Sequence, residues 1–229
     1  MISIIGKEPT FDKDEIRVKM NKYTRRALGM LPKLNKPRIL DLGCGSGEPT
    51  MEFARLTDAN IVAIDIDKWA LDKLRDKISK AGLNHRLTVI EGSIGSLDFA
   101  DESFDILWSE GSIAALGFAQ GLKYWRRFIK PGGYLGVHDE LVDLELKIKL
   151  ISKNGYKLLG HFLIPLETWR EEFFKPLEER ISEFAGLTIN DPKTIEELNS
   201  AKRDLEMYRR TPERNQSVFF VMQKAEMNY

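Results

Sequence analysis

Short apolar runs alternate with stretches of helical periodicity from about residue 38 to residue 164. The apolar runs predict strands at 38–43, 59–67, 87–93, 104–111, 134–140 and 157–164. The periodic stretches predict helices at 48–56, at 68–81, through 122–128 and at 141–153. Because strands that alternate with helices favour crossover connections, the pattern predicts an α/β fold with a mostly parallel sheet.

The pattern changes after residue 164, where a helix-rich stretch at 166–210 precedes a last β-rich run, SVFFVMQK, at 217–224. We interpret 166–210 as a helical insertion on the substrate side of the fold. Earlier in the chain, the tripeptide Pro131-Gly132-Gly133 is predicted to stop a helix and turn the chain into the strand at 134–140. Proline lacks an N–H donor and glycine accepts positive φ, so both favour such a turn.

The turn DLGCGSG at 41–47 joins the first predicted strand to the first predicted helix. Its residues Gly43, Gly45 and Gly47 allow backbone amides to approach a ligand closely, as nucleotide-like ligands require. Dinucleotide-binding folds usually place a further glycine where this chain has Glu48, and a carboxylate there repels a pyrophosphate. The sequence therefore disfavours a nicotinamide-dependent oxidoreductase.

A cationic nucleoside suits these charges better. S-adenosylmethionine has no phosphate and carries a sulfonium and an ammonium group, which match Asp41 and Glu48 electrostatically. Asp65 ends the next predicted strand, where its carboxylate can accept two hydrogen bonds from a ribose diol. Ile66 follows it and is predicted to pack on the adenine. Cys44, the single cysteine, lies inside the turn.

Four segments, DLGCGSG, IVAIDID, VIEGSIGSLDFADESFDILWSEGSI and FIKPGGYL, resemble the successive motifs of class I S-adenosylmethionine-dependent methyltransferases. The resemblance covers residues 38–140. It implies a doubly wound, Rossmann-like sheet of seven strands with helices on both faces, whose last strand, with 217–224 as the candidate, runs antiparallel. The segment at 167–181 is also similar to a piece of uncharacterised small-molecule methyltransferases of this class.

The same resemblance implies roles in cofactor binding. It places Asp41, Gly43 and Gly45 against the methionine moiety. It places Asp65 on the ribose, Ser93 and Ile94 beside the adenine, and Glu110 near the reacting methyl group. Many relatives have Asp where this chain has Ser93, which weakens the expected contact with the adenine amino group. The predicted cofactor site comprises Asp41, Gly43, Cys44, Gly45, Gly47, Asp65, Ile66, Ser93, Ile94 and Glu110.

Methyl transfer from a sulfonium is an in-line displacement with an activated donor, so positioning and exclusion of water can supply most of the catalysis. A general base is optional and depends on the acceptor. Glu110, His138 and Glu140 end adjacent predicted strands at the ligand edge of the sheet. We predict Glu110 and His138 as catalytic candidates. The alternatives are that Glu110 only bonds backbone and that His138 is a structural or exposed histidine.

Aromatic side chains form the predicted acceptor pocket, because an aromatic wall selects shape and attracts a cationic amine. The candidates are Trp169, Phe173, Tyr208 and, from the basic N-terminal helix, Tyr23. Trp169 and Phe173 lie four residues apart on one helical face, so core packing remains the alternative for both.

Composition limits the remaining possibilities. With 229 residues, of which 42% are hydrophobic, and no apolar run near the roughly 18 residues of a membrane span, we expect one domain and no membrane partner. We expect this domain to divide into an N-terminal helical cap (1–37), a cofactor-binding core (38–140) and a C-terminal part (141–229). The 35 basic and 35 acidic residues give no net attraction to nucleic acid. One cysteine excludes a disulfide framework. The N-terminal residues do not have the pattern of a basic leader, so we expect a cytoplasmic enzyme. We also expect no metal site, because one cysteine excludes multi-cysteine zinc or iron-sulfur sites.

The predicted function is methyl transfer from S-adenosylmethionine to a small molecule, which releases S-adenosylhomocysteine. An RNA or protein methyltransferase is the competing enzyme. The fourth strand ends in SEGSI and lacks the Asn/Asp-Pro-Pro-aromatic motif of many base methyltransferases, and Ala119 and Gln120 stand where a protein arginine methyltransferase has a second glutamate. A non-catalytic cofactor-binding module is the third possibility, against which the intact glycines argue. The acceptor and the oligomeric state stay open.

Overall fold

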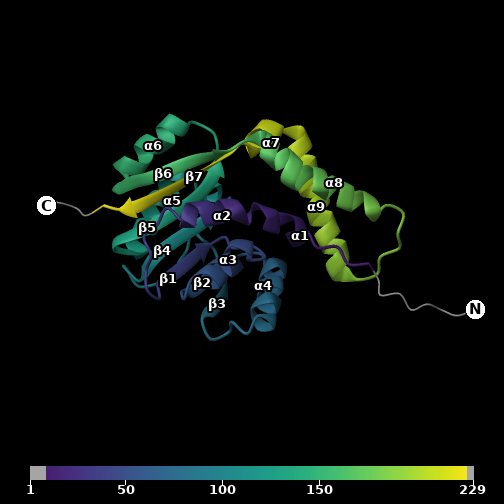
Figure 1. The fold of residues 1–229 in the computed structure, drawn as a ribbon, viewed down its shortest axis with the longest axis horizontal. Helices are drawn as coiled ribbons and strands as arrows, with labels where there is room; N and C mark the ends of the chain where they lie inside the picture. Colours follow the sequence, from purple (N-terminus) through teal and green to yellow (C-terminus); the bar gives the residue numbers. More distant parts are fainter. Residues whose placement is uncertain (1–8, 226–229) are drawn as a thin grey trace, which may run out of the picture.

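A mixed β-sheet forms the centre of residues 9–225, the part of the chain that the computed structural model describes (Figure 1). Its strands are β1 (Arg38–Leu42), β2 (Asn60–Asp65), β3 (Leu87–Glu91), β4 (Phe104–Glu110), β5 (Ile129–Glu140), β6 (Tyr156–Ile164) and β7 (Ser217–Lys224). The order in the sheet is β3-β2-β1-β4-β5-β7-β6, and β7 runs antiparallel to both of its neighbours. The predicted seven-stranded α/β fold with an antiparallel last strand is confirmed.

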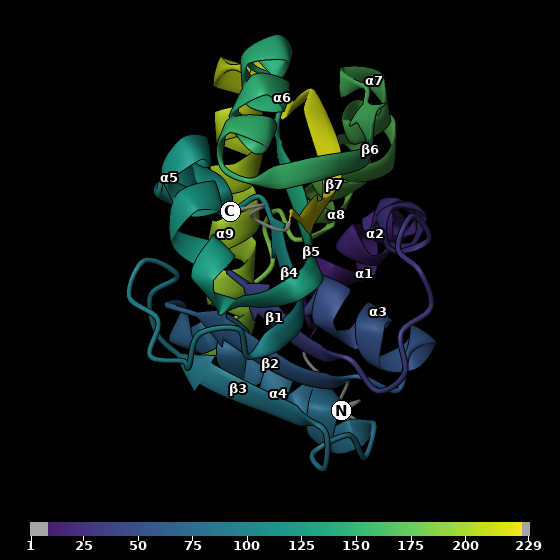
Figure 2. The same ribbon diagram turned by 90° about the vertical axis from the view of Figure 1, so that its left-hand side faces the viewer.

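Helices cover both faces of the sheet (Figures 1 and 2). On one face lie α2 (Asn21–Leu28), α3 (Glu48–Leu56) and α4 (Lys68–Lys80), which share a buried core with β1, β2 and β7. On the other face, α5 (Phe118–Trp125) and α6 (Leu144–Lys153) share a second core with alternate residues of the same strands. A strand buried on both faces presents apolar side chains in both directions, which explains the unbroken apolar runs of the sequence.

A third hydrophobic cluster lies outside the sheet, where the N-terminal segment packs against helices of the 166–210 stretch. It is formed by α1 (Asp14–Arg17), the π-helical segment η4 (Arg170–Phe174), α8 (Lys175–Glu183) and α9 (Pro192–Arg210). Its buried members are Phe11, Ile16, Phe173, Phe174, Leu177, Phe184, Leu198, Ala201 and Leu205. We call this unit the cap; it differs from the N-terminal helical cap predicted at 1–37 because it includes α8 and α9. The insertion at 166–210 is therefore packed against the N-terminal segment, a pairing that the sequence did not indicate.

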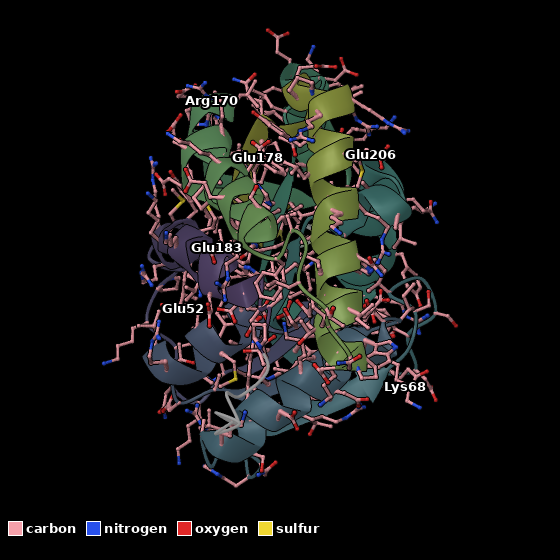
Figure 3. The ribbon with its side chains drawn as sticks, turned by 90° about the vertical axis from the view of Figure 1, so that its right-hand side faces the viewer. Glu52, Lys68, Arg170, Glu178, Glu183 and Glu206 are labelled. Atoms are coloured by element: carbon pink, nitrogen blue, oxygen red, sulfur yellow. The ribbon has the colours of Figure 1, made fainter. Side chains whose placement is uncertain are left out.

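Charged side chains cover the outer side of the cap (Figure 3). Glu178 on α8 pairs with Arg209 on α9, and Glu206 pairs with Arg210 one turn further along α9. Such exposed pairs each contribute little stability. The buried aromatic residues of the cap therefore account for its packing.

The structure corrects the prediction for Pro131-Gly132-Gly133. The helical segment ends at Phe128, after the short turn η3 (Arg126–Phe128), and β5 begins at Ile129. Between the pairs Phe104↔Ile129 and Ile106↔Tyr134, β4 advances two residues and β5 advances five, so the tripeptide lies in a bulge of β5. A proline in a bulge does not remove a ladder hydrogen bond, which is why the strand continues past it.

Smaller differences concern boundaries. The helix expected at 141–153 begins at Leu144, because Asp143 adopts a left-handed conformation with φ 52°. The connections also contain η1 (Val18–Met20), η2 (Ile113–Ala115), α7 (Leu166–Trp169) and η5 (Pro212–Asn215). The division into parts at residues 37 and 140 remains a prediction, and its first eight residues lie outside the described range. No helix within residues 9–225 has both the length and the apolarity to cross a membrane.

Candidate functional site

The glycine turn between β1 and α3 adopts a conformation that depends on its glycines. Gly43, Gly45 and Gly47 have φ of 73°, 53° and 82°, in the left-handed region that side chains rarely adopt. A Cβ on Gly43 would lie 2.3 Å from the Cβ of Ser112, and one on Gly47 would lie 2.3 Å from Leu74. The amides of residues 43 and 44 donate to the carbonyl of Ile64 at 2.8 and 3.1 Å, which fixes the turn to β2.

A cavity of about 330 Å³ lies between this turn and the cap. The turn and the ends of β1 and β4 form its floor, and α1 and α9 form its roof. Six residues predicted for the site line it, namely Asp41, Gly43, Cys44, Gly45, Glu110 and Phe173. Lining residues from the cap and from α4 were not predicted from the sequence: Lys13, Asp14, Arg17, Trp69, Ala70, Glu196, Glu197, Ser200, Arg203 and Asp204. Tertiary contacts between the cap and α4 bring these together, so no local signal indicated them.

Asp41 lies beneath this cavity, with 1% of its surface exposed. The hydroxyl of Thr50 donates to its Oδ2 over 2.5 Å. Burial raises the pKa of Asp41 to about 7, an effect that Thr50 opposes and the nearby carboxylates of Glu110 and Asp65 reinforce. A buried carboxyl group that loses its proton near neutral pH is stabilised by a cation placed beside it. Asp41 is therefore suited to a positively charged ligand.

Asp65 holds the loop that surrounds the glycine turn. Its Oδ2 accepts from the amide of Gly45 at 2.7 Å and its Oδ1 accepts from the amide of Asp67 at 2.9 Å. Since each carboxylate oxygen has two acceptor positions, the group retains capacity for further donors. The next residue, Ile66, is 74% exposed.

Several residues predicted to bind the cofactor do not line the cavity, namely Gly47, Asp65, Ile66, Ser93 and Ile94. The hydroxyl of Ser93 accepts from the amide of Gly95, and the carbonyl of Ile94 accepts from the indole of Trp125. Gly47 lies between β1 and α3, and the other four lie at or after the carboxyl ends of the neighbouring strands β2 and β3. Their contacts with the nucleoside remain predictions.

Ion pairs connect the cap to the glycine turn. The buried carboxylate of Asp14 pairs with Lys73 and Lys77 at 2.9 and 2.8 Å and accepts from the hydroxyl of Ser46. Burial raises its pKa, but the two lysines outweigh burial and lower the pKa to about 2. Lys77 also lies 2.5 Å from Glu48. The prediction that Glu48 faces a cationic ligand is therefore corrected, because Glu48 forms an ion pair with Lys77.

Cys44 presents its thiol from within the turn and is 6% exposed. Burial raises the pKa of this thiol far above its ordinary value, and the neighbouring Asp41 and Asp65 raise it further. The thiolate is the nucleophilic form of cysteine. Cys44 is therefore a neutral packing residue of the site.

Glu110 ends β4 and lines the cavity below the cap, with 6% of its side chain exposed. Its Oε1 accepts from Thr24 at 2.7 Å and from the indole of Trp108 at 2.9 Å, while its Oε2 faces Arg17 at 3.2 Å. All three partners are side chains, so the alternative that Glu110 only bonds backbone is wrong. The donors fix its carboxylate at the edge of the sheet.

His138 of β5 lies beside Glu110 in the sheet, where the two residues are register partners. Its ring stacks on Trp169 with 5.8 Å between centroids and lies 5.0 Å from Phe219. Its Nε2 is buried and has no hydrogen-bond partner within residues 9–225. Burial lowers the pKa of His138 to about 3, assisted by the charges of Arg17 and Lys147. The ring is therefore neutral and carries an unused polar atom.

A narrow recess continues from the cavity toward His138. Its walls are Arg17, Met20, Tyr23, Glu110, His138, Ile164, Trp169 and Phe219. Two of the four predicted acceptor-binding residues, Tyr23 and Trp169, therefore lie together with both predicted catalytic residues. Arg17 and Glu110 line the cavity and the recess alike and form the boundary between them.

The other predicted acceptor residues lie elsewhere. Phe173 lines the larger cavity and belongs to the core of the cap. Tyr208 stacks on Phe174 at 3.9 Å between centroids with an interplanar angle of 9°, and it lines neither the cavity nor the recess. Glu140 forms an ion pair with Arg214 outside both. In the described range, no group of three or more His, Cys, Asp or Glu residues is arranged to hold a metal ion.

Comparisons with known proteins agree with this geometry. Residues 39–133 match the family model described as a methyltransferase domain. The chain is similar to the sterol 24-C-methyltransferase of Aspergillus fumigatus, with 32% identity over 106 residues, which are 46% of this chain and 28% of the relative. It is similar to the 27-O-demethylrifamycin SV methyltransferase of Amycolatopsis mediterranei, with 30% identity over 122 residues, which are 53% of this chain and 45% of the relative.

The matched segments span less than half the length of these curated relatives. In fold, the chain is similar to phosphoethanolamine N-methyltransferase 2 of Haemonchus contortus, which was solved in complex with S-adenosyl-L-methionine. The TM-score is 0.66 at 17% identity, over 94% of this chain and 58% of the other. The residues that the family model matches include the glycine turn and the strands β2, β3 and β4. Residues 39–133 are therefore assigned to the methyltransferase-domain family, and the sheet order of the chain agrees with that assignment.

Proposed function

We propose that this protein transfers the methyl group of S-adenosylmethionine to a small-molecule acceptor. The observation that carries the proposal is the cavity above the glycine turn, at the carboxyl ends of β1 and β4, with the buried carboxyl of Asp41 in its floor. Ligands of open α/β sheets bind outside the carboxyl ends of the strands. A carboxyl group whose pKa is raised to about 7 is neutral or charged as its surroundings require, and a cationic ligand favours the charged form.

The residues of the site fit the cofactor. Asp41 and the backbone of residues 43–45 would hold the charged methionine moiety, since a Cβ at Gly43 would collide with Ser112 and displace the turn that lines the cavity. Asp65 would accept from the ribose hydroxyls, and Ile66, Ser93 and Ile94 would border the adenine. When bound, the cofactor supplies an electrophilic methyl group on a positively charged sulfur.

Catalysis would then depend on positioning and on exclusion of water. The cap covers the cavity, and the aromatic recess beyond Glu110 excludes solvent from the place where an acceptor would sit. Glu110 and His138 would orient the acceptor from its two sides. His138 is neutral at physiological pH, so it would accept or donate one hydrogen bond without adding charge.

A small acceptor is favoured because the cap covers the cavity and the recess. A nucleic acid or a folded protein needs an open approach. The two relatives named above, a sterol and a rifamycin methyltransferase, are consistent with a small acceptor. We also propose a cytoplasmic location, which fits a chain whose single cysteine forms no disulfide, and cell fractionation would test it.

Release of S-adenosylhomocysteine, measured across fractionated pools of metabolites, tests the activity. We expect at least one pool to produce turnover above the slow hydrolysis of the cofactor alone. Glu110→Gln should lower that turnover by about a hundredfold while cofactor affinity changes little, the scale on which a single positioned group acts. The matched control is Glu140→Gln, which removes a carboxylate from the next strand outside the site. Equal turnover in the Glu110→Gln variant and in the unmodified protein would remove Glu110 from the mechanism.

A further inference from the structure

Arg17 occupies a position that a ligand would be expected to fill. Its Nη2 lies 3.2 Å from Oε2 of Glu110, and its guanidinium carbon lies 5.6 Å from the centre of the Trp169 ring. It also lines both the cavity and the recess. The one cation at the junction of the two therefore lies between a buried carboxylate and an aromatic face.

These two groups together form a site for positive charge. Thr24 and Trp108 donate to Oε1 of Glu110, which leaves Oε2 directed to the cation. Trp169 is held in turn, because its indole donates to Ser217 at 2.9 Å and its ring stacks on His138. A carboxylate and an indole face fixed in this way attract any cation of suitable size.

The rest of the recess suits alkyl groups and lacks a site for negative charge. Met20, Ile164 and Phe219 form apolar walls, and the Nε2 of His138 is buried without a partner among the described residues. Arg17 is the only cationic side chain among the residues that line the recess. An acceptor with one nitrogen and small alkyl substituents matches these walls.

We propose that the acceptor is a small alkylamine whose nitrogen takes the position between Glu110 and Trp169 that the Arg17 guanidinium holds in this structure. The inference rests on the proposed methyltransferase function. In the reaction, the lone pair of the amine forms the new C–N bond as the S–CH₃ bond breaks, and the positive charge passes from sulfur to nitrogen. An alkylamine that arrives as its ammonium ion first releases one proton to solvent, which frees the lone pair, and the product nitrogen then carries the positive charge.

This arrangement favours the transition state over the bound amine. The amine is uncharged when it attacks, and its nitrogen becomes cationic as the bond forms. A carboxylate and an aromatic ring beside that nitrogen interact more strongly with the developing charge than with the neutral amine. Glu110 and Trp169 would therefore lower the barrier directly.

Arg17 can leave this position if another anion replaces Glu110 as its partner. Its side chain is 25% exposed, and within residues 9–225 Glu110 is the one carboxylate with which it forms an ion pair. The other lining cations, Lys13 and Arg203, pair with Asp204 and Glu196 in the cap. A ligand carboxylate that enters the cavity, such as that of the cofactor, would supply that anion.

The test compares choline with its uncharged isostere 3,3-dimethyl-1-butanol by calorimetry, using the full chain saturated with S-adenosylhomocysteine. Arg17→Met retains the apolar stem and removes the competing cation, so we expect it to bind choline about tenfold more tightly than the unmodified protein. The double variants Arg17→Met/Glu110→Gln and Arg17→Met/Trp169→Leu should lose that gain. The isostere should bind weakly to all of them.

Arg26→Met is the matched control, because the Arg26 guanidinium lies 4.0 Å from the Phe162 ring without a carboxylate partner in the described structure. It should leave choline binding unchanged. Equal binding of choline and its isostere would overturn the proposal, as would tighter binding of acetate to the unmodified protein with loss in Arg17→Met. S-adenosylhomocysteine that fails to bind would refute the proposed function itself, and normal binding of that ligand with no preference for choline would refute only the amine acceptor.

Discussion

The carboxylate of Asp14 in the cap accepts a hydrogen bond from the hydroxyl of Ser46 in the glycine turn, over 2.8 Å. The contact joins the N-terminal helix to the loop that would hold the cofactor. Lys73 and Lys77 add two ion pairs to the same carboxylate. The roof of the cavity and its floor are thus connected through one buried acidic residue.

Asp14→Asn should loosen this connection. The folded-state pKa of about 2 lies below the ordinary 3.8, so ionised Asp14 stabilises the fold above pH 4, and this contribution disappears as pH falls through 2. The shift corresponds to about 2 kcal/mol. Urea unfolding at pH 7 should show a loss of that order, together with weaker cofactor binding. Asp72→Asn removes an exposed ion pair with Arg75 and should change neither; equal losses in the two variants would contradict the assignment.

Gly43→Ala should abolish cofactor binding. The added Cβ meets Ser112 at 2.3 Å, and the residue has φ 73°, so both crowding and backbone strain oppose it. We expect destabilisation by about 2 kcal/mol or more. Gly82→Ala is the control, since its φ of 67° imposes similar strain with no atom within 4 Å. It should cost about 1 kcal/mol and leave cofactor affinity intact. Retained affinity in Gly43→Ala would show that the turn does not cradle the ligand.

Cofactor binding should release a proton from Asp41 below pH 7. Because its folded-state pKa of about 7 exceeds the ordinary 3.8, Asp41 costs the free protein stability as pH rises from 4 to 7. A bound ammonium or sulfonium favours the ionised form, so affinity should rise with pH up to about 7 and then level. Calorimetry at pH 6 in buffers of different ionisation enthalpy measures the released proton. Asp41→Asn should eliminate the release; a pH-independent affinity in the unmodified protein would exclude this role.

His138 should make the protein sensitive to acid. Its folded-state pKa of about 3 lies below the ordinary 6.5, so the neutral ring supports the fold fully above pH 6.5 and progressively less as pH falls toward 3. At pH 5 the difference amounts to about 2 kcal/mol. His138→Phe keeps the stack on Trp169 and should unfold at a less pH-dependent temperature between pH 5 and pH 8. The exposed His85→Gln variant should behave like the unmodified protein, and a His138→Phe variant with undiminished acid sensitivity would refute the explanation.

The parts of the fold that the sequence predicted are those set by local pattern. The strand at 217–224 and the helix at 48–56 have the predicted bounds, because alternation of apolar runs with turn residues marks them. The bulge at Pro131 was not predictable, since a proline-glycine run also marks a turn. Whether a strand continues through it depends on the pairing of β4 with β5.

In the candidate site, too, the residues of local motifs were predictable and those brought together by tertiary contacts were not. Asp41, Gly43, Gly45 and Glu110 belong to motifs contiguous in sequence, and the structure brings them to one cavity. The cap depends on contacts between residues far apart in the chain, such as Lys13 with Asp204. Charged residues at such positions look like an ordinary solvated helix face. The boundary role of Arg17 was therefore not predictable from its position in a basic N-terminal segment.

Titration of the full chain with S-adenosylmethionine and S-adenosylhomocysteine by calorimetry tests the central claim, that the cavity above the glycine turn binds this cofactor. The account predicts saturable binding of both at one site per chain, loss of that binding in Gly43→Ala, and retention in Gly82→Ala. Absence of binding at millimolar cofactor, or binding that Gly43→Ala leaves unchanged, would contradict it.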